Sequence, residues 1–227
     1  MTPRSTLTLL AVFALNLVAC GSMTTPDAGF IVTGGGGGTT GSGGGSGSTQ
    51  DAGVDAGSAC TVSTTSFGDL GVLMGDVTFD NGTTPNDTTD DIITLQAKLE
   101  NATPGDIMTL ELYANLGAFA ANDGGVIAPG TYAIAGDEVD YATCGVCVRL
   151  YTNATSSAYG DDYMPTSGLV TITQVGNAVG GAFEATVSNL TFRHVRIDSM
   201  TFTSTLANDT CASTLTAASY TGTLAAP

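Results

Sequence analysis

The sequence predicts an all-β protein: a single antiparallel β-sandwich of jelly-roll or Ig-like type, stapled by disulfides, which follows a disordered, glycine-rich tether. Three observations lead to this prediction. Apolar residues recur at every second position in much of residues 60–227, as in strands with one buried face. Segments rich in threonine and valine alternate with glycine-containing turns. The same region contains Cys60, Cys144, Cys147 and Cys211.

The clearest predicted element is a hairpin. Residues 93–99 and 108–112 each alternate apolar with polar side chains, and Pro104-Gly105 lies in the turn-forming segment between them. Strands at short spacing favour an antiparallel sandwich or barrel. Residues 111–121 could instead form a short helix. Further strands are expected over residues 131–135, 147–152, 168–175, 182–189, 191–197, 200–204 and 214–224.

The first twenty residues have the features of a secretion signal. Arg4 supplies a positive charge, and residues 7–19 form an apolar stretch that is too short to span a bilayer. This stretch ends in Leu17-Val18-Ala19-Cys20, which resembles the lipobox of bacterial lipoproteins. The resemblance implies that residues 1–19 are a cleaved signal peptide and that acyl chains on Cys20 anchor the protein in a membrane of the bacterial cell envelope. The alternatives are an ordinary secretory signal that contains a cysteine and an uncleaved membrane helix.

Two further regions follow the proposed lipidation site. Gly21 and Ser22 occupy the positions where an aspartate would resemble an inner-membrane retention signal, so we expect the outer membrane. Residues 20–59 form the tether: ten of the fourteen residues in 34–47 are glycine, a composition that behaves as a flexible coil. Residues 60–227 are long enough for one domain with its own core.

Acidic residues dominate the charge of the chain. There are 21 Asp and Glu against 5 Lys and Arg, which gives a formal net charge of −16. Nucleic acid is excluded as a partner, because binding to its phosphates needs a basic face. His194 is the sole histidine, so catalysis by several histidines is excluded as well. Neither Gly-X-Ser-X-Gly nor Gly-X-X-X-X-Gly-Lys occurs, and no cofactor is expected.

The four cysteines of residues 60–227 are expected to form two disulfides. Cys144 and Cys147 have the spacing of a redox motif, but redox pairs open a helix and this pair precedes a predicted strand. A zinc site of all four cysteines would lack the usual close spacing in its second half. We favour Cys60–Cys211 together with Cys144–Cys147. The alternative joins Cys60 and Cys211 separately to the two central cysteines.

Two sets of side chains are candidates for a ligand site. A patch of aromatic and basic residues could bind an anion or stack against a protein or glycan partner: His194, Arg196, Tyr151 and Tyr163. In the alternative, the basic residues pair with nearby acids and the tyrosines fill the edge of the core. Calcium takes six to eight oxygen ligands, and the candidates for it are Asp80, Asp87, Asp90 and Asp91. The alternative for these aspartates is a set of solvated turns.

These features favour a surface lipoprotein of the cell envelope that presents a non-catalytic binding or structural module and is not an enzyme. The alternative is a hydrolase of envelope polymers that uses paired carboxylates, and it is supported by the number of acids. A close carboxylate pair in a deep cleft would favour the hydrolase. A shallow, open surface would favour the binding module.

Overall fold

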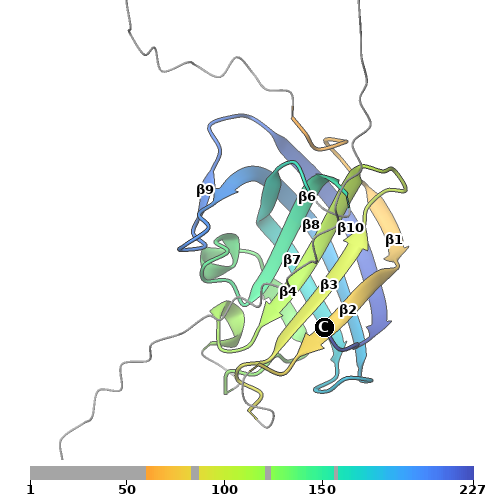
Figure 1. The fold of residues 1–227 in the computed structure, drawn as a ribbon, viewed down its shortest axis with the longest axis vertical. Coiled ribbons are helices and arrows are strands. Elements are labelled where there is room, and N and C mark those ends of the chain that lie inside the picture. The colour runs from red at the N-terminus through yellow and green to blue at the C-terminus, as the bar shows by residue number, and fades with distance from the viewer. Residues whose placement is uncertain (1–59, 83–86, 121–123, 156–157) are drawn as a thin grey trace, which may run out of the picture. The chain divides into compact units, whose positions relative to one another are not determined.

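The computed structural model describes residues 60–82, 87–120, 124–155 and 158–227. The predicted signal peptide (residues 1–19), the lipidation site Cys20 and the tether (residues 20–59) lie outside these described residues. The elements in chain order are β1 (Asp69–Leu73), β2 (Gly75–Asp80), β3 (Ile92–Lys98), β4 (Gly105–Tyr113), the 3-10 helix η1 (Gly117–Phe119), β5 (Gly130–Ala133), the 3-10 helix η2 (Gly136–Val139), β6 (Val146–Ala154), β7 (Asp162–Val175), β8 (Ala182–Ile197), β9 (Ser204–Leu206) and β10 (Ala212–Thr223) (Figure 1). Among the described residues, no helix has the length and apolar character needed to cross a membrane.

All ten strands of the described residues belong to one mixed sheet, in the order β1-β10-β8-β7-β6-β4-β3-β2, with β5 added to β7 and β9 to β8. The β1–β10 pair is parallel and the other pairs of named strands are antiparallel. The sheet curls into a half-barrel (Figure 1). The all-β prediction is therefore confirmed, whereas the two-sheet sandwich is wrong. Alternation identifies the buried face of a strand, but it does not say whether a second sheet or the same sheet covers that face.

The two ends of the strand order come close together. β1 and β2 lie at opposite ends of this order, although only Met74 separates them in the chain. Beyond β10, Ala225 N donates to Val77 O at 2.9 Å, and Ala225 O accepts from Phe79 N at 2.8 Å, so the C-terminal segment also contacts β2. These links between the edges lower the number of unpaired backbone groups at the ends of the sheet.

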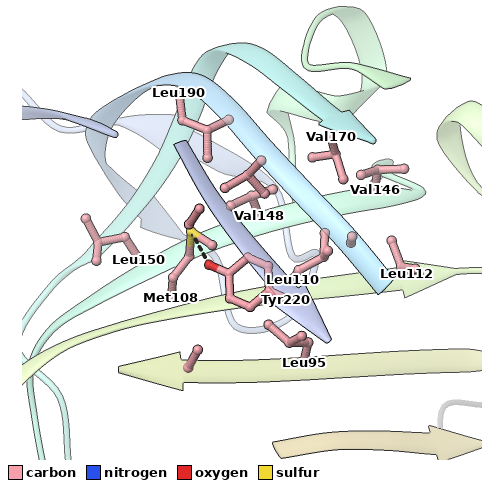
Figure 2. Close-up of a cluster of buried hydrophobic side chains, with 14 of the residues drawn as sticks. Leu95, Met108, Leu110, Leu112, Val146, Val148, Leu150, Val170, Leu190 and Tyr220 are labelled. Carbon is pink, nitrogen blue, oxygen red and sulfur yellow. Dashed lines mark hydrogen bonds between the residues drawn. The ribbon is translucent and has the colours of Figure 1, made fainter. Parts of the chain in front are cut away.

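The core lies inside the curl of the sheet. Side chains from β3, β4, β6, β7, β8 and β10 converge there and are almost completely buried, among them Leu95, Met108, Leu110, Leu112, Val146, Val148, Leu150, Val170, Leu190 and Tyr220 (Figure 2). The Tyr220 hydroxyl, also buried, donates to Met108 Sδ at 3.7 Å. The predicted hairpin is confirmed as β3–β4, with Leu95 opposite Leu110. Its apolar positions face the core, as the alternation predicts.

Several predicted elements have different bounds in the structure. The expected strands 182–189 and 191–197 form one strand, β8, and the expected strand 168–175 is the second part of the longer β7. The expected strand 200–204 is displaced to β9, because the Asp198 carboxylate accepts N–H bonds from Met200 and Thr201 and forms a turn there. Residues 111–121 form the end of β4 and only one turn of 3-10 helix among their described positions.

Three neighbouring strands, β7, β8 and β10, change phase at the same level of the sheet: the residues that face the core switch there between odd and even numbers. In β8 the residues that face the main core shift from odd numbers (Phe183, Ala185, Val187) to even numbers (Leu190, Phe192). Asn189 lies at this shift with φ 52°, and Gly168 of the paired strand β7 has φ 132°. In β10, Thr216 drops out of the pairing with β8. The bulges in the β7–β8 pair bend these strands and increase their twist, which lets β7 and β8, of 14 and 16 residues, follow the curl.

The cysteines form the pairing that we favoured. Cys60–Cys211 and Cys144–Cys147 have Cα–Cα distances of 5.4 and 5.3 Å. The first disulfide joins residues 151 positions apart, and it connects the segment before β1 to the residue that precedes β10. Closing so long a loop restricts the unfolded chain and thereby stabilises the fold.

The phase change predicts a strong effect of a side chain at Gly168. A Cβ at this position would lie 2.5 Å from Leu190 Cδ2, and the φ of 132° is one that L-residues rarely adopt. We expect Gly168→Ala to lower the free energy of unfolding in urea by about 2–4 kcal/mol, from backbone strain and overpacking together. The control is Gly136→Ala, where φ is 62° and a Cβ meets nothing within 4 Å. This change should cost about 1 kcal/mol, and equal losses in the two variants would contradict the close packing at Gly168.

Candidate functional site

The outer face of β3, β4 and β6 carries an open groove of about 620 Å3, which we call the tyrosine groove. Met108, Leu110 and Leu112 of β4 point into the core (Figure 2), so the alternate residues Thr109 and Glu111 point to the outer face. The polar and aromatic side chains that line the groove are Thr94, Gln96, Thr109, Glu111, Tyr151 and Tyr159.

Strand register brings these side chains together. Thr94 lies opposite Glu111, and Gln96 lies opposite Thr109, in the β3–β4 pair. Tyr151 of β6 lies opposite Ile107 of β4, two positions before Thr109. Directly opposed residues on one face of a sheet have Cβ atoms about 4.5–5.5 Å apart. The floor of the groove is therefore built on three adjacent strands, β3, β4 and β6, which pair with one another in that order.

The carboxylate of Glu111 is held by two phenols. Glu111 Oε2 accepts hydrogen bonds from the Tyr113 hydroxyl at 2.7 Å and from the Tyr141 hydroxyl at 2.8 Å. Burial raises the pKa of Tyr113 and of Tyr141, and the charge of Glu111 raises both further. The two hydroxyls therefore stay protonated and serve as donors. No described residue donates to the other oxygen, Glu111 Oε1.

Arg149 fixes the position of Tyr151. Its guanidinium lies 4.2 Å from the centroid of the Tyr141 ring and 4.6 Å from that of Tyr151. It also forms an ion pair with Asp162, with Arg149 Nη2 and Asp162 Oδ1 2.7 Å apart. Such cation–π contacts are stronger where water is excluded, and Arg149 is only 8% exposed. Tyr151 in turn contacts Tyr159 edge to face, with ring centroids 4.6 Å apart.

Thr109 has a hydroxyl without a partner among the described residues. The residue is only 4% exposed, and its Oγ1 atom makes no hydrogen bond. Buried polar atoms in native proteins are nearly always hydrogen-bonded, and leaving one unpaired costs about 1–3 kcal/mol. Since Thr109 lines the tyrosine groove, a hydroxyl or water in the groove could supply the missing bond.

A second hollow, of about 650 Å3, lies beside the Cys60–Cys211 disulfide, and we call it the histidine groove. The ring of His194 stacks on Tyr163, with centroids 5.3 Å apart. His194 Nδ1 lies 2.5 Å from Asp209 Oδ2, and His194 Nε2 lies 3.6 Å from Asp161 Oδ1. The imidazole is thus placed between two carboxylates.

The acids of the histidine groove are already engaged. Partial burial acts to raise the pKa of Asp209, but hydrogen bonds from His194 and from the N–H of Cys211 outweigh burial and lower it. Asp161 accepts a hydrogen bond from the Thr61 hydroxyl at 2.7 Å, and Asp162 is paired with Arg149. A general acid needs a raised pKa, so Asp209 does not fit that role.

The four residues of the sequence-based patch do not share one surface. His194 and Arg196 both line the histidine groove, where Arg196 forms no ion pair with a described residue. Tyr163 is completely buried beneath the imidazole. Tyr151 lies in the tyrosine groove. Sequence reasoning did not include Glu111 or Thr109 in a site, although the alternation of the predicted hairpin already assigns both to the outer face.

The acidic loop behaves as a set of turns in its described part. Asp80 Oδ1 accepts from Gly82 N at 3.0 Å, and Asp87 Oδ1 accepts from Thr89 N at 3.0 Å. Residues 83–86 lie outside the described residues. Within the described part of the chain, no group of three or more His, Cys, Asp or Glu side chains could hold a metal ion. Burial, followed by the charges of Asp90, Asp87 and Asp80, raises the pKa of Asp91.

Comparison of the chain with protein-family models, curated proteins and solved structures gives no match. The function must therefore be inferred from the two grooves.

The buried Cys144–Cys147 disulfide adds no exposed redox group, since both residues are fully buried.

The raised pKa of Asp91 predicts a pH-dependent gain of stability in Asp91→Asn. A carboxyl with a higher pKa in the folded than in the unfolded protein destabilises the fold above that pKa, and the penalty disappears as the pH falls. We expect the variant to melt about 1–3 °C higher at pH 7, since 1 kcal/mol shifts the Tm of such a domain by about 2–4 °C. The gain should vanish below the ordinary carboxyl value of 3.8.

The matched control for this measurement is Asp76→Asn, which removes an equal charge from an exposed position. Its melting temperature should stay close to that of the wild type at both pH values. Equal gains in the two variants would mean that net charge, rather than the surroundings of Asp91, controls the effect.

Proposed function

We propose that the protein is a surface lipoprotein of the cell envelope, that its domain is a non-catalytic binding module, and that the tyrosine groove is its ligand site. The observation that carries this proposal is the groove itself. Its volume of about 620 Å3 lies within the range of about 300–1,000 Å3 typical of ligand sites. It combines two tyrosine rings with a few fixed polar groups, which is the composition expected of such sites.

Binding fits the groove better than catalysis. Among the described residues that line it, Glu111 is the only acid. Glycoside hydrolysis in most families needs two carboxyl groups separated by about 5 Å or by about 6.5–9.5 Å. The histidine groove gathers Asp161, Asp162 and Asp209, which supports the hydrolase as a second candidate. The basic partners of Asp162 and Asp209 count against it.

The proposed anchor and tether suit a binding module. Residues 21–59 after the proposed lipidation site are 39 in number. A flexible coil of this length has a root-mean-square span of roughly 35 Å, so it would hold the domain clear of the membrane surface. The net charge of −16 disfavours adhesion to anionic lipid. The outer membrane remains the proposed location.

The anchor is tested by Cys20→Ser. The full-length variant should lose incorporation of radiolabelled palmitate and the cleavage of residues 1–19 that depends on lipidation, because the acylated side chain is removed. Ser22→Ala keeps the cysteine and should be labelled like the wild type. Labelling of Cys20→Ser at the wild-type level would contradict the lipoprotein proposal.

The groove is tested by cross-linking in cells. A photoreactive phenylalanine analogue replaces Tyr159, which is 51% exposed, in the full-length protein, and in a second variant it replaces Val179, which is 58% exposed and lies outside the groove. We expect a cross-linked adduct with an envelope component from position 159 and none from position 179.

Two outcomes would contradict this proposal. The first is the absence of an adduct at position 159, or equal adducts at both positions. The second is the release of reducing ends from envelope polymers by the wild-type protein and their loss in Asp161→Asn, which would favour the hydrolase.

A further inference from the structure

We infer that the tyrosine groove binds an extended, neutral polysaccharide chain, an inference that rests on the proposed binding function. The groove adjoins a smaller hollow of about 380 Å3, and Gln96 and Ile107 line both. This smaller hollow extends to Met74, Asp76 and Lys98. Together the two hollows cross the outer face from β2 to β6, which suits a ligand of several units rather than a single small molecule.

The backbone beneath the groove argues against an extended peptide. β3 is paired with β2 and β4, and β4 is paired with β3 and β6. Peptides that add a strand to a sheet need a free edge, and these strands offer none at the groove. The ligand must therefore be recognised through side chains alone.

The side chains match the two kinds of surface on a sugar ring. The face of an aromatic ring is electron-rich, so Tyr151 and Tyr159 can attract the polarised C–H groups on the flat side of a pyranose. Gln96, Thr94 and Thr109 offer hydroxyl and amide groups to the sugar hydroxyls at the ring edge. This alternation of apolar ring and polar rim is what a neutral saccharide requires.

Two groups in the groove have unused hydrogen-bonding capacity. Thr109 Oγ1 is buried without a partner, and Glu111 Oε1 receives no donor from a described residue. A sugar hydroxyl both donates and accepts, so one chain of such hydroxyls could donate to Glu111 and bond to Thr109. An anionic ligand would instead be repelled by Glu111 and by the acidic chain.

The aromatic part of the site is fixed before binding. Arg149, held by Asp162, lies against Tyr151 and keeps its ring in place. A ligand then meets an ordered ring, and little conformational freedom is lost on binding. Arg149 is a positioning residue, since it does not line the groove.

The test measures binding by the full-length protein in a detergent without a sugar headgroup. The probes are neutral hexasaccharides (gluco-, xylo-, manno-, galacto- and N-acetylchitohexaose), with hexagalacturonate and hexalysine as charged comparisons. Titration calorimetry gives Kd, and tyrosine fluorescence offers a second readout because the chain has no tryptophan. We expect at least one neutral hexasaccharide to bind, Tyr159→Ala to weaken this binding at least tenfold, and Thr109→Val to weaken it about fivefold.

Thr109→Val keeps the shape of the side chain and removes only the unpartnered hydroxyl, so folding should be preserved. Matched controls are Met200→Ala, 88% exposed, and Thr221→Val on the exposed side of β10; both should bind like the wild type. Failure of every neutral hexasaccharide to bind, or unchanged binding by Tyr159→Ala, overturns the inference. Binding of only hexagalacturonate, weakened by Tyr159→Ala, overturns the neutral charge of the ligand, and binding of only hexalysine overturns the saccharide class; either result leaves the binding function intact.

Discussion

The fold depends on the phase change that β7, β8 and β10 make together. Without it, a strand as long as β8 would turn its polar side toward the core for half of its length, because side chains alternate strictly between faces. Gly168 and Asn189 accept backbone angles that few residues tolerate, and Gly68 O accepts N–H bonds from Thr216 and Ala217 where β10 changes phase. The bend that results lets a single sheet close around its own core.

This closure explains why an outer groove exists at all. Since the core is covered by the sheet itself, the outer face of β3, β4 and β6 needs no second sheet. Part of the outer face is nevertheless covered: the Cys144–Cys147 disulfide, Met164 and Val195 form a small apolar cluster on it, with Tyr141 packed against them. The tyrosine groove lies on a part of the outer face outside this cluster.

Charge is scarce in this protein, and two of its buried charges, Arg149 and Glu138, have structural roles. Arg149 joins Asp162 to the rings of Tyr141 and Tyr151, so one of only 5 basic residues is used to fix the groove. Glu138, 4% exposed, accepts N–H bonds from Ala118 and Val146 at 2.6 Å each. Burial raises the pKa of Glu138, and these backbone bonds oppose the rise. This carboxylate therefore connects η1 to the start of β6.

Local patterns in the sequence determined the β class, the hairpin β3–β4 and the outward position of Thr109 and Glu111, because alternation is a property of each strand by itself. Three features were decided only by tertiary structure. The strands form one sheet rather than two, the consecutive strands β1 and β2 lie at the two opposite ends of this sheet, and Tyr151 lies apart from His194. Each of these depends on which distant segments pair, as with Thr78 and Ala225. Pairing over such distances is set by the closure of the whole sheet, and no local spacing of residues encodes it.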